Sequence, residues 1–492
     1  MDLGNIASLD FFYPEAILTG TVLLVVLLDL VLTNKRVLGL VALAGCLLSL
    51  WATLQLYGTS GGWLFHRMIV LDNFSLFFKL VSLFAAILVL WMSRGSREVG
   101  EVHQGEYSAI LLSSTLGMFF MASSTNLLMA YLSLELVSLT SYILTGFLPH
   151  NRRSSEAALK YLIYGGVASG TMIYGMSWIF GMAGSLDYAR INQALLQGEA
   201  NHLGLFIAFV FILAGFGYKI VFVPFHMWSP DVYQGAPTPI TAFLSVGANA
   251  AGVAILIRFF FPAVSRLGDD GNWMFLSGVE WPQFLLMVSM VTMTLGNLSA
   301  LNQQNVKRLL AYSGIAHAGY ILMGLVVLNN EGLQAMLFYI VVYMIMNLGA
   351  FLVVVIVANA TGKEDIESYR GLAWRGSAIL AVSMAIFLFS LTGLPPLAGF
   401  VGKFFLFAAV IKQQFYLLAV VAVINSVISL YYYARVVKTM FLDFPEPSDR
   451  EVKMTGGAAV LLGLLSSMTV IFGIYWGPLV AFTNHSLRFF VK

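Results

Sequence analysis

Four charged residues lie deep within apolar stretches of this chain: Glu135, Lys160, Lys219 and Lys403. Their flanks are long, as in AYLSLELVSLTSYIL around Glu135. A charge at bilayer depth costs at least about 2.5–3.5 kcal/mol on insertion scales, so such residues usually face a bundle interior or a wet cavity. Only 10% of the residues are charged, whereas soluble domains carry about 25%. The four charges therefore predict a path for protons or cations through a membrane protein.

The apolar runs predict an all-α polytopic membrane protein with about fourteen transmembrane helices, because about 20 residues are needed to cross the hydrocarbon. No polar stretch between the runs is long enough for a soluble domain, so the energy for transport would come from an ion gradient or from partner proteins. We expect the spans at 13–33, 37–57, 70–92, 107–124, 126–148, 156–182, 203–228, 237–262, 281–300, 306–328, 332–360, 376–411, 415–442 and 455–484.

The distribution of the 26 Lys and Arg residues predicts the orientation in the membrane. An even number of spans puts both termini on one side, and the side richer in Lys and Arg is cytoplasmic. This bias predicts that both termini lie outside the cytoplasm, in the plasma membrane of a bacterium. The richer side includes Arg94, Arg97, Lys363, Arg370, Arg450 and Lys453, and the poorer side includes Arg67, Arg190, Arg258, Arg266, Lys412, Arg488 and Lys492.

Two spans carry the sequence signs of a broken helix, and each contains a buried lysine. One reads GFGYKIVFVPFHMW around Lys219, and the other reads TGLPPLAGFVGKFF before and around Lys403. Proline removes a helix hydrogen bond, and at membrane depth such breaks are tolerated where the backbone lines a cavity. The two spans are five spans apart, and paired interrupted helices indicate a transporter's working site. The alternative is that Pro and Gly are simply common in membrane helices.

The buried charges have distinct predicted roles. Glu135 and Lys160, on consecutive spans, are natural partners, although Lys160 could also extend to the inner surface. Lys219 and Lys403 lie at the breaks, where burial lowers the affinity of a lysine for its proton and a nearby carboxylate restores it. Such a lysine is a protonation switch. The alternative role for both is an anchor that caps carbonyls freed by the break.

Three further residues are candidates for a proton relay. His226 follows Pro224 in VPFHMW, and His317 lies in GIAHAGY; each is either a relay group, because histidine titrates near neutrality, or a packed neutral histidine. Lys307 begins a span from the inner side, where it would orient the helix or receive a proton. Charges nearer the span ends are expected to be structural, namely Asp29, Asp72 and Lys79.

Several function classes are excluded by composition. The single cysteine, Cys46, rules out a disulfide framework, a thiolate iron–sulfur cluster and a Cys-based zinc site within the chain. No basic tract indicates nucleic acid, and there is no phosphate-binding glycine loop. We therefore expect neither a metal nor a redox cofactor in this chain.

Taken together, these residues resemble the subunit N family of the proton-pumping NADH–quinone oxidoreductase, bacterial respiratory complex I. The resemblance covers nearly the whole chain, and the string PFHMWSPDVYQGAPTP is specific to subunit N among its antiporter-like relatives. Its strongest segments are YLSLELVSLTSYILTGF (131–147), SSEAALKYLIYGGVASG (154–170), GYKIVFVPFHMWSPDVYQGAPTPITAFLSVG (217–247), NVKRLLAYSGIAHAGY (305–320) and GLPPLAGFVGKFFLF (393–407).

The resemblance implies fourteen helices with two five-helix inverted repeats. The implied parts are N-terminal helices at 1–106, repeats at 107–262 and 281–442, and a C-terminal helix at 443–492. The family's Glu–Lys pair matches Glu135 and Lys160, its channel lysines match Lys219 and Lys403, and its histidine between half-channels matches His226. Where relatives often carry a further lysine, this chain has Asn249, which cannot carry a proton.

The function that the resemblance implies is that of a non-redox, proton-translocating subunit of a translocase. NADH, FMN, iron–sulfur clusters and quinone would be bound by partner subunits. The expected partners are other complex I membrane subunits, the hydrophilic redox arm through the assembly, and lipids. One alternative is a subunit of a multisubunit cation/proton antiporter or membrane-bound hydrogenase. Another is a structural membrane anchor whose charges only lock helices together.

Overall fold

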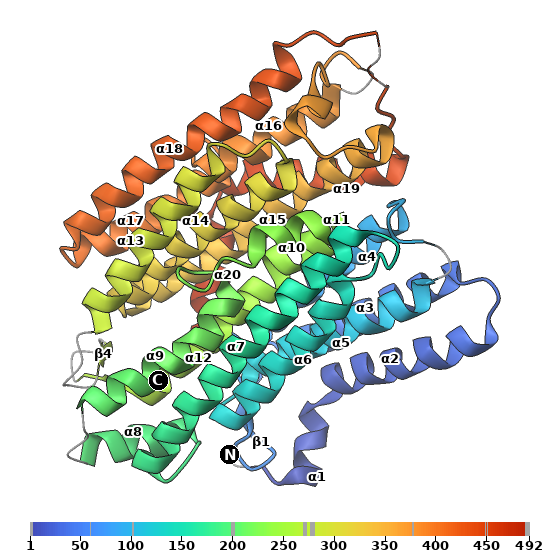
Figure 1. Cartoon of the computed structure of the whole chain (residues 1–492). Coiled ribbons are helices and arrows are strands. Elements are labelled where there is room, and N and C mark those ends of the chain that lie inside the picture. The colour runs from blue at the N-terminus through green and yellow to red at the C-terminus, as the bar shows by residue number, and fades with distance from the viewer. Residues whose placement is uncertain are drawn as a thin grey trace.

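The protein is a bundle of long helices that run side by side, as the computed structural model shows (Figure 1). Three of the cations used to predict the orientation, Arg450, Arg488 and Lys492, lie outside the described residues. The structure describes residues 3–59, 61–100, 103–197, 202–268, 273–275, 281–375, 378–447, 449 and 451–487.

The N-terminal half of the chain contributes most of the helices at the blue and green end of Figure 1. Polar caps begin several of these helices: Asp72 and Ser75 form a capping box at the helix that begins at Asn73, and Asn126 and Asn151 cap the helices that follow them directly. The elements are α1 (Asn5–Ser8), η1 (Leu9–Phe11), α2 (Tyr13–Val31), α3 (Arg36–Leu56), β1 (Gly62–Leu64), β2 (Ile69–Leu71), α4 (Asn73–Arg94), α5 (Gln104–Ser123), α6 (Leu127–Thr145), α7 (Arg152–Ala183), α8 (Tyr188–Gln197), α9 (His202–Ile220), α10 (Ser229–Gly235), α11 (Thr238–Phe243), η3 (Leu244–Ala248) and α12 (Asn249–Val264).

The C-terminal half also consists mainly of long helices with polar caps, and it begins with a short β-hairpin. Asn305, Asn329 and Thr455 cap three of its helices. The elements are β3 (Ser265–Leu267), β4 (Trp273–Phe275), α13 (Trp281–Ala300), α14 (Val306–Val327), α15 (Asn330–Thr361), η4 (Ile366–Tyr369), α16 (Ala378–Thr392), α17 (Ala398–Lys412), α18 (Tyr416–Phe441), α19 (Gly456–Ile474) and α20 (Gly477–Ser486). Each pair of neighbouring strands, β1–β2 and β3–β4, is antiparallel.

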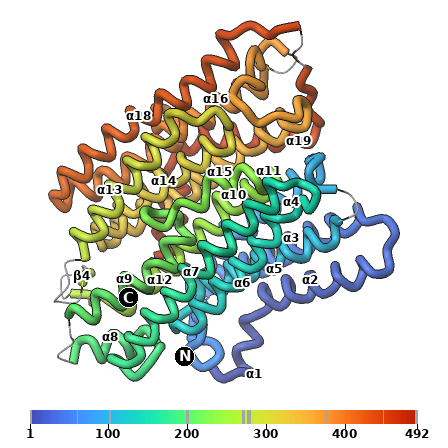
Figure 2. Tube along the Cα trace, in the orientation of Figure 1, coloured from blue at the N-terminus to red at the C-terminus, as the bar shows by residue number. Residues whose placement is uncertain are grey.

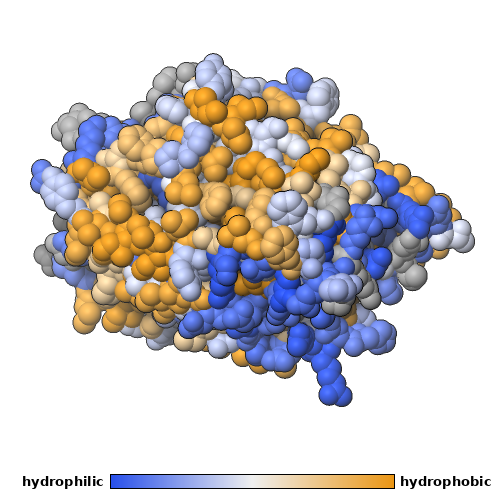
Figure 3. All heavy atoms as spheres, turned by 90° about the horizontal axis from the view of Figure 1, so that it is seen from above, coloured by the Kyte–Doolittle hydropathy of each residue, from blue (hydrophilic) through white to orange (hydrophobic). Residues whose placement is uncertain are grey.

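Within the described residues, eleven helical segments are long and apolar enough to cross a membrane. The protein is therefore an all-α, multi-pass membrane protein, as the sequence predicts. Most predicted spans coincide with a helix within a few residues; 281–300, for example, is α13 (Trp281–Ala300). Apolar side chains cover much of the face seen in Figure 3, where hydrophilic ones gather on one side.

Both described ends of the chain lie at the same end of the bundle. The backbone N–H of Leu3 donates to the Trp63 carbonyl of β1 over 2.9 Å. The side chain of Asn73, just beyond β2, lies 3.4 Å from the carbonyl of His485 in α20. The N-terminal and C-terminal segments therefore meet around one hairpin, and Figure 2 shows the two chain ends in the same part of the bundle.

Two helices are interrupted where the sequence predicts. α9 ends at Ile220, and the chain runs irregularly until α10 begins at Ser229. Val221 has φ +70°, a left-handed conformation that is an outlier for a β-branched residue. In the second half, α16 ends at Thr392 and α17 begins at Ala398. Between α11 and α12 the helix widens into the π-helical segment η3, a feature frequent at functional sites.

One cation expected at the membrane surface is instead buried. Arg258 of α12 forms two hydrogen bonds with Asp72, NH1 to Oδ2 over 2.7 Å and NH2 to Oδ1 over 2.5 Å. Arg258, counted with the cations of the poorer side, is therefore not a surface cation, because the residue joins α12 to the start of α4. Lys79 of α4 likewise pairs with Glu15 of α2 over 2.5 Å, and both side chains are buried. These pairs fasten the N-terminal helices together.

Candidate functional site

Lys219 lies at the end of α9, just before the first break. Its side chain is buried, and its Nζ is 3.5 Å from Ser138 Oγ on α6 and 6.0 Å from the ring centre of Tyr161 on α7. Among the described residues it forms no ion pair. The stem packs on α12, where a Cβ at Gly252 would lie 3.3 Å from Lys219 Cγ. Lys219 is thus held among hydroxyl and aromatic groups at the contact of three helices.

Glu135 lies on α6 one turn before Ser138, so the two side chains share a helix face. Its Oε1 accepts a short hydrogen bond from Ser169 Oγ on α7. Ser169 also lies 3.2 Å from the hydroxyl of Tyr131. Glu135 is half-buried, and Leu132 and Leu139 on the same helix are exposed. The carboxylate therefore lies at the apolar outer side of this chain, close to the Lys219 region.

The expected pairing of Glu135 with Lys160 is not formed. Lys160 Nζ lies 2.6 Å from Asp231 Oδ2 on α10 and 2.7 Å from Glu156 one turn back on α7. The long side chain extends toward polar groups near the start of α7. Arg308 of α14 binds the other oxygen of Asp231 over 2.5 Å. Asp231, which the sequence analysis did not single out, is therefore the shared carboxylate of Lys160 and Arg308.

The first turn of α14 holds both ends of α10. Arg308 contacts Asp231 near the start of α10, and Lys307 Nζ donates to the carbonyl of Ala236 just past its end over 2.7 Å. Lys307 also pairs with Glu364 over 2.8 Å and is fully buried. Lys307 is thus more than an orientation anchor, because it joins the short helix after the first break to the second half of the chain.

His226 lies in the irregular segment between α9 and α10 and is buried. Its Nδ1 has no hydrogen-bond partner within the described part of the chain, and the same holds for Asn249 Oδ1 at the start of α12. Both groups face the interior of the bundle. Buried polar atoms normally find a protein or water partner, so these two atoms are sites where water would bind.

Lys403 and His317 share one cluster in the second half. Lys403 Nζ donates to the carbonyl of Thr392, the last residue of α16, over 2.8 Å, and to Ser426 Oγ over 3.2 Å. The same Nζ lies 4.4 Å from the ring centre of Tyr320. His317 Nδ1 lies 2.6 Å from the hydroxyl of Tyr339. The lysine therefore bridges the second break, as the anchor alternative predicts, and faces the histidine's aromatic neighbours.

A row of buried polar side chains lies between the two lysine regions, and we call it the central polar row. From the Lys219 side, Asn249 and Ser245 share a face of η3 and α12, and Asn347 Nδ2 donates to Ser245 Oγ over 2.8 Å. The ring of Tyr343 on the same helix as Asn347 lies 4.9 Å from that of His317, and His317 lies 5.9 Å from Tyr320. The members of the row are Asn249, Ser245, Asn347, Tyr343, His317 and Tyr320.

Sequence reasoning identified the charged ends of this site and missed its neutral middle. Tyrosine and asparagine are ordinary packing residues in membrane helices, and nothing in their spacing distinguishes them. A usable signal for Asp231 was present, because it is an acid directly after a predicted break. Glu364 lies in a polar loop, GKEDIESYRG, where an acid carries no signal of its own.

A helical bundle with two interrupted helices, each next to a buried lysine, defines the class of antiporter-like membrane proteins. The family described as "NADH:quinone oxidoreductase/Mrp antiporter, TM" matches residues 124–429. The NADH-quinone oxidoreductase subunit N of Anaeromyxobacter sp. (strain Fw109-5) is 46% identical, over 99% of this chain and 98% of the relative. The chain belongs to the NADH-quinone oxidoreductase subunit N family.

Solved structures agree with this assignment. A chain of respiratory complex I from Thermus thermophilus, solved with bound aureothin, is 29% identical with a TM-score of 0.80, covering 95% of this chain and 98% of that one. A chain of the Mrp complex from Dietzia sp. DQ12-45-1b has a TM-score of 0.83 at 20% identity, with 98% of each chain covered. The second likeness shows a shared fold alone.

Proposed function

We propose that this chain is a proton-translocating membrane subunit of NADH–quinone oxidoreductase, which couples quinone reduction in other subunits to proton transfer. The observation that supports the proposal is the central polar row, a set of buried polar groups that lies between the Lys219 and Lys403 regions. Family membership supplies the driving reaction, since the relatives are named as subunits of that enzyme. Moving one proton against about 100 mV costs about 2.3 kcal/mol.

The proposed proton path has proton-binding side chains at its two ends and water-binding side chains in between. Lys219 and Lys403 hold and release the proton at either end of the row, and His317 lies between them. His226 Nδ1 and Asn249 Oδ1 bind water that continues the path where this chain lacks a lysine. Asn249 cannot accept the proton itself, so at this point transfer proceeds along the water.

Charge exchange at Lys160 controls the first lysine. Lys160 is paired with Asp231 and Glu156 in this structure. In the exchange, it leaves Asp231 for Glu135, neutralises that carboxylate, and so removes a negative charge from the neighbourhood of Lys219. A nearby carboxylate favours the charged form of a lysine, so Lys219 would release its proton into the row once that carboxylate is neutralised. Lys307 would receive protons from the inner solution through its contact with Glu364.

The finer architecture follows from family membership and the order of the helices. If the interrupted pairs α9–α10 and α16–α17 each count as one span, as do α11, η3 and α12 together, and the short helices α1, α8 and α20 are left out, fourteen spans result. The inverted repeats then correspond to 107–262 and 281–442, preceded by helices within 1–106 and followed by 443–492. Both termini lie outside the cytoplasm of the bacterial plasma membrane.

The chain works within an assembly. Its partners are the other complex I membrane subunits, and through them the hydrophilic arm that binds NADH, FMN, iron–sulfur clusters and quinone. This chain binds none of these groups. Glu135 and exposed apolar residues on α6, such as Leu132 and Leu139, lie on a side that a neighbouring membrane subunit would cover.

The test is purification of the assembly by a tag on this chain, with mass-spectrometric identification of its subunits. A redox arm that oxidises NADH should copurify, and the assembly in vesicles should take up protons when NADH is added. The isolated chain should show neither NADH oxidation nor quinone reduction. Redox turnover by the chain alone, or copurification without a redox arm, would contradict the proposal.

A cation/proton antiporter subunit is a second candidate, because the Mrp chain shares the fold closely. Sodium-dependent proton exchange in vesicles without NADH would favour it.

A purely structural anchor is a third candidate function, favoured by the hydrogen bond from Lys403 to the Thr392 carbonyl. In that case neutral replacements would lower assembly and proton transfer equally.

A further inference from the structure

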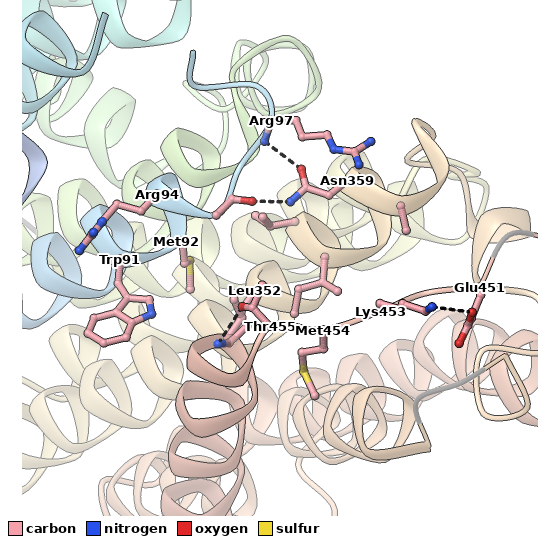
Figure 4. A pocket seen from close by; sticks show the side chains of 15 residues that line it. Trp91, Met92, Arg94, Arg97, Leu352, Asn359, Glu451, Lys453, Met454 and Thr455 are labelled. Atoms are coloured by element: carbon pink, nitrogen blue, oxygen red, sulfur yellow. Dashed lines mark hydrogen bonds and ion pairs between the residues drawn. The ribbon is translucent and has the colours of Figure 1, made fainter. Parts of the chain in front are cut away.

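A cavity of about 630 Å³ opens between the ends of α4, α15 and α19, away from the central polar row (Figure 4). Arg94 is the last residue of α4, Arg97 lies in the turn that follows, and Lys453 precedes α19. Figure 4 shows these side chains around the cavity together with Trp91 and Leu352. Three cations from two distant segments thus gather at one end of the bundle.

The lining of the cavity changes from polar to apolar along the axes of the helices. Its polar lining lies where the spans end, with Asn359 close to the end of α15. Its apolar lining lies deeper and includes Met92, Leu352 and Ile356. Leu352 and Asn359 are seven residues apart, which is about 10 Å along a helix. That depth covers the headgroup region and the upper part of the hydrocarbon.

The charge of the rim is positive and is held in place. Asn359 accepts from the backbone N–H of Arg97 over 3.0 Å and donates to the carbonyl of Gly95 over 2.7 Å. This double contact fixes the turn that carries Arg97 against α15. Lys453 lies 3.3 Å from Glu451, whereas among the described residues the guanidinium groups of Arg94 and Arg97 form no ion pair. Figure 4 shows the two guanidinium groups pointing away from each other, with Arg94 on the side of Trp91 and Arg97 on the side of Asn359, so positive charge is spread along the rim.

We propose that this cavity binds one anionic phospholipid. The phosphodiester would receive hydrogen bonds from Arg94, which lies on the side of Trp91 in Figure 4, since guanidinium binds phosphate oxygens in a fork. Arg97 would add positive charge to the rim. An acyl chain would lie along Met92, Leu352 and Ile356, and the indole of Trp91 would mark the interface. Basic pockets between membrane helices on the cytoplasmic side bind anionic headgroups. A free phosphate would leave the apolar lining uncovered.

The experiment uses the whole purified assembly in nanodiscs of phosphatidylcholine, with or without phosphatidylglycerol. The readout is the number of phosphatidylglycerol molecules retained per complex in native mass spectrometry. Wild type should retain one more than the double variant Arg94→Gln/Arg97→Gln. The matched control is Arg152→Gln/Lys438→Gln, two exposed cations on α7 and α18, which do not line the cavity, and it should retain the wild-type number. Equal retention in all three would overturn the proposal.

A second variant tests the apolar part and serves if the double variant does not assemble. Ala458→Trp fills the lining near the start of α19 and leaves both guanidinium groups in place. It should also lose the one lipid. Retention of the lipid by this variant, or its displacement by inorganic phosphate alone, would assign the rim to a free anion. A partner subunit's segment seen in the cavity by electron cryomicroscopy would overturn the lipid assignment as well.

Discussion

Lys160 lies 2.6 Å from Asp231, a carboxylate on the far side of the first helix break, and forms no ion pair with Glu135 on the neighbouring helix. Asp231 in turn binds Arg308 of α14. The lysine expected to pair within the first repeat is therefore connected to the second half of the chain. Any change in its charge acts on α10, the short helix after the break, and on the start of α14.

Replacement of Asp231 by Asn should lower NADH-driven proton uptake while leaving most of the complex assembled. Its ion pairs are half-exposed, and such pairs contribute about 1 kcal/mol or less to stability. The matched control is Glu156→Gln, which removes the other carboxylate partner of Lys160 on an exposed helix face. Proton uptake in inverted vesicles, divided by the amount of assembled complex, should fall in the first variant and stay near wild type in the control.

Glu135→Gln should impair proton uptake more than assembly, because Gln keeps an oxygen to accept from Ser169 and loses only the charge. Lys160→Ala should have a weaker effect, since Arg308 still neutralises Asp231. Complex abundance by native electrophoresis and proton uptake are measured together. Parallel loss of both quantities would assign Glu135 to helix packing.

Asn249→Lys should be tolerated, with coupled activity near wild type. Asn249 Oδ1 has no hydrogen-bond partner among the described residues, so replacing this side chain breaks no bond made by that oxygen. The family resemblance implies that a lysine is accommodated at this position. The measurements are complex abundance and NADH-driven proton uptake. Failure to assemble would mean that Asn249 is packed in a dry environment.

Lys219→Met and Lys403→Met should each reduce proton uptake strongly, and the double variant should be little worse than the more damaging single one. A serial path explains this, because one interruption already stops transfer. Independent roles would make the two losses add, as they do for distant unrelated sites. Arg258→Leu is the structural control: it leaves Asp72 buried without its partner, which costs about 3–5 kcal/mol, so assembly itself should fall.

Gly393→Ala should reproduce part of the Lys403 defect. Gly393 has φ +92°, and a Cβ there would lie 2.9 Å from Lys403 Cδ. The control is Gly362→Ala, where φ is +73° but nothing lies within 4 Å of the added Cβ. The left-handed conformation costs about 1–2 kcal/mol in both variants. Only Gly393→Ala should shift the lysine, so a larger loss of proton uptake in that variant isolates the contact.

Most of the fold could be predicted from the sequence, because hydrophobic length and proline position act locally. The spans, the break after Lys219 and the break before Lys403 all follow from residues within a few turns. Long-range pairing could not be predicted in this way. Arg258 was expected at the surface, and it is buried because Asp72, 186 residues away, supplies two carboxylate oxygens.

The same distinction explains which parts of the site were missed. Charged residues in apolar flanks are conspicuous whatever their partners, so Lys219 and Lys403 could be named at once. Tyr343 and Asn347 become part of a site only because α15 is buried at the centre, next to η3 and α14. Their role depends on tertiary packing, which periodicity does not encode.

The bond from Lys403 to the last carbonyl of α16 makes the second break responsive to charge. A protonated lysine closes the gap between α16 and α17 with a charge-assisted hydrogen bond, about twice as strong as a neutral one. Loss of the proton weakens that closure at the same moment. The strength of the contact between α16 and α17 therefore depends on whether Lys403 carries a proton. A neighbouring subunit in contact with this span would respond to the protonation of Lys403 through the shape of the break.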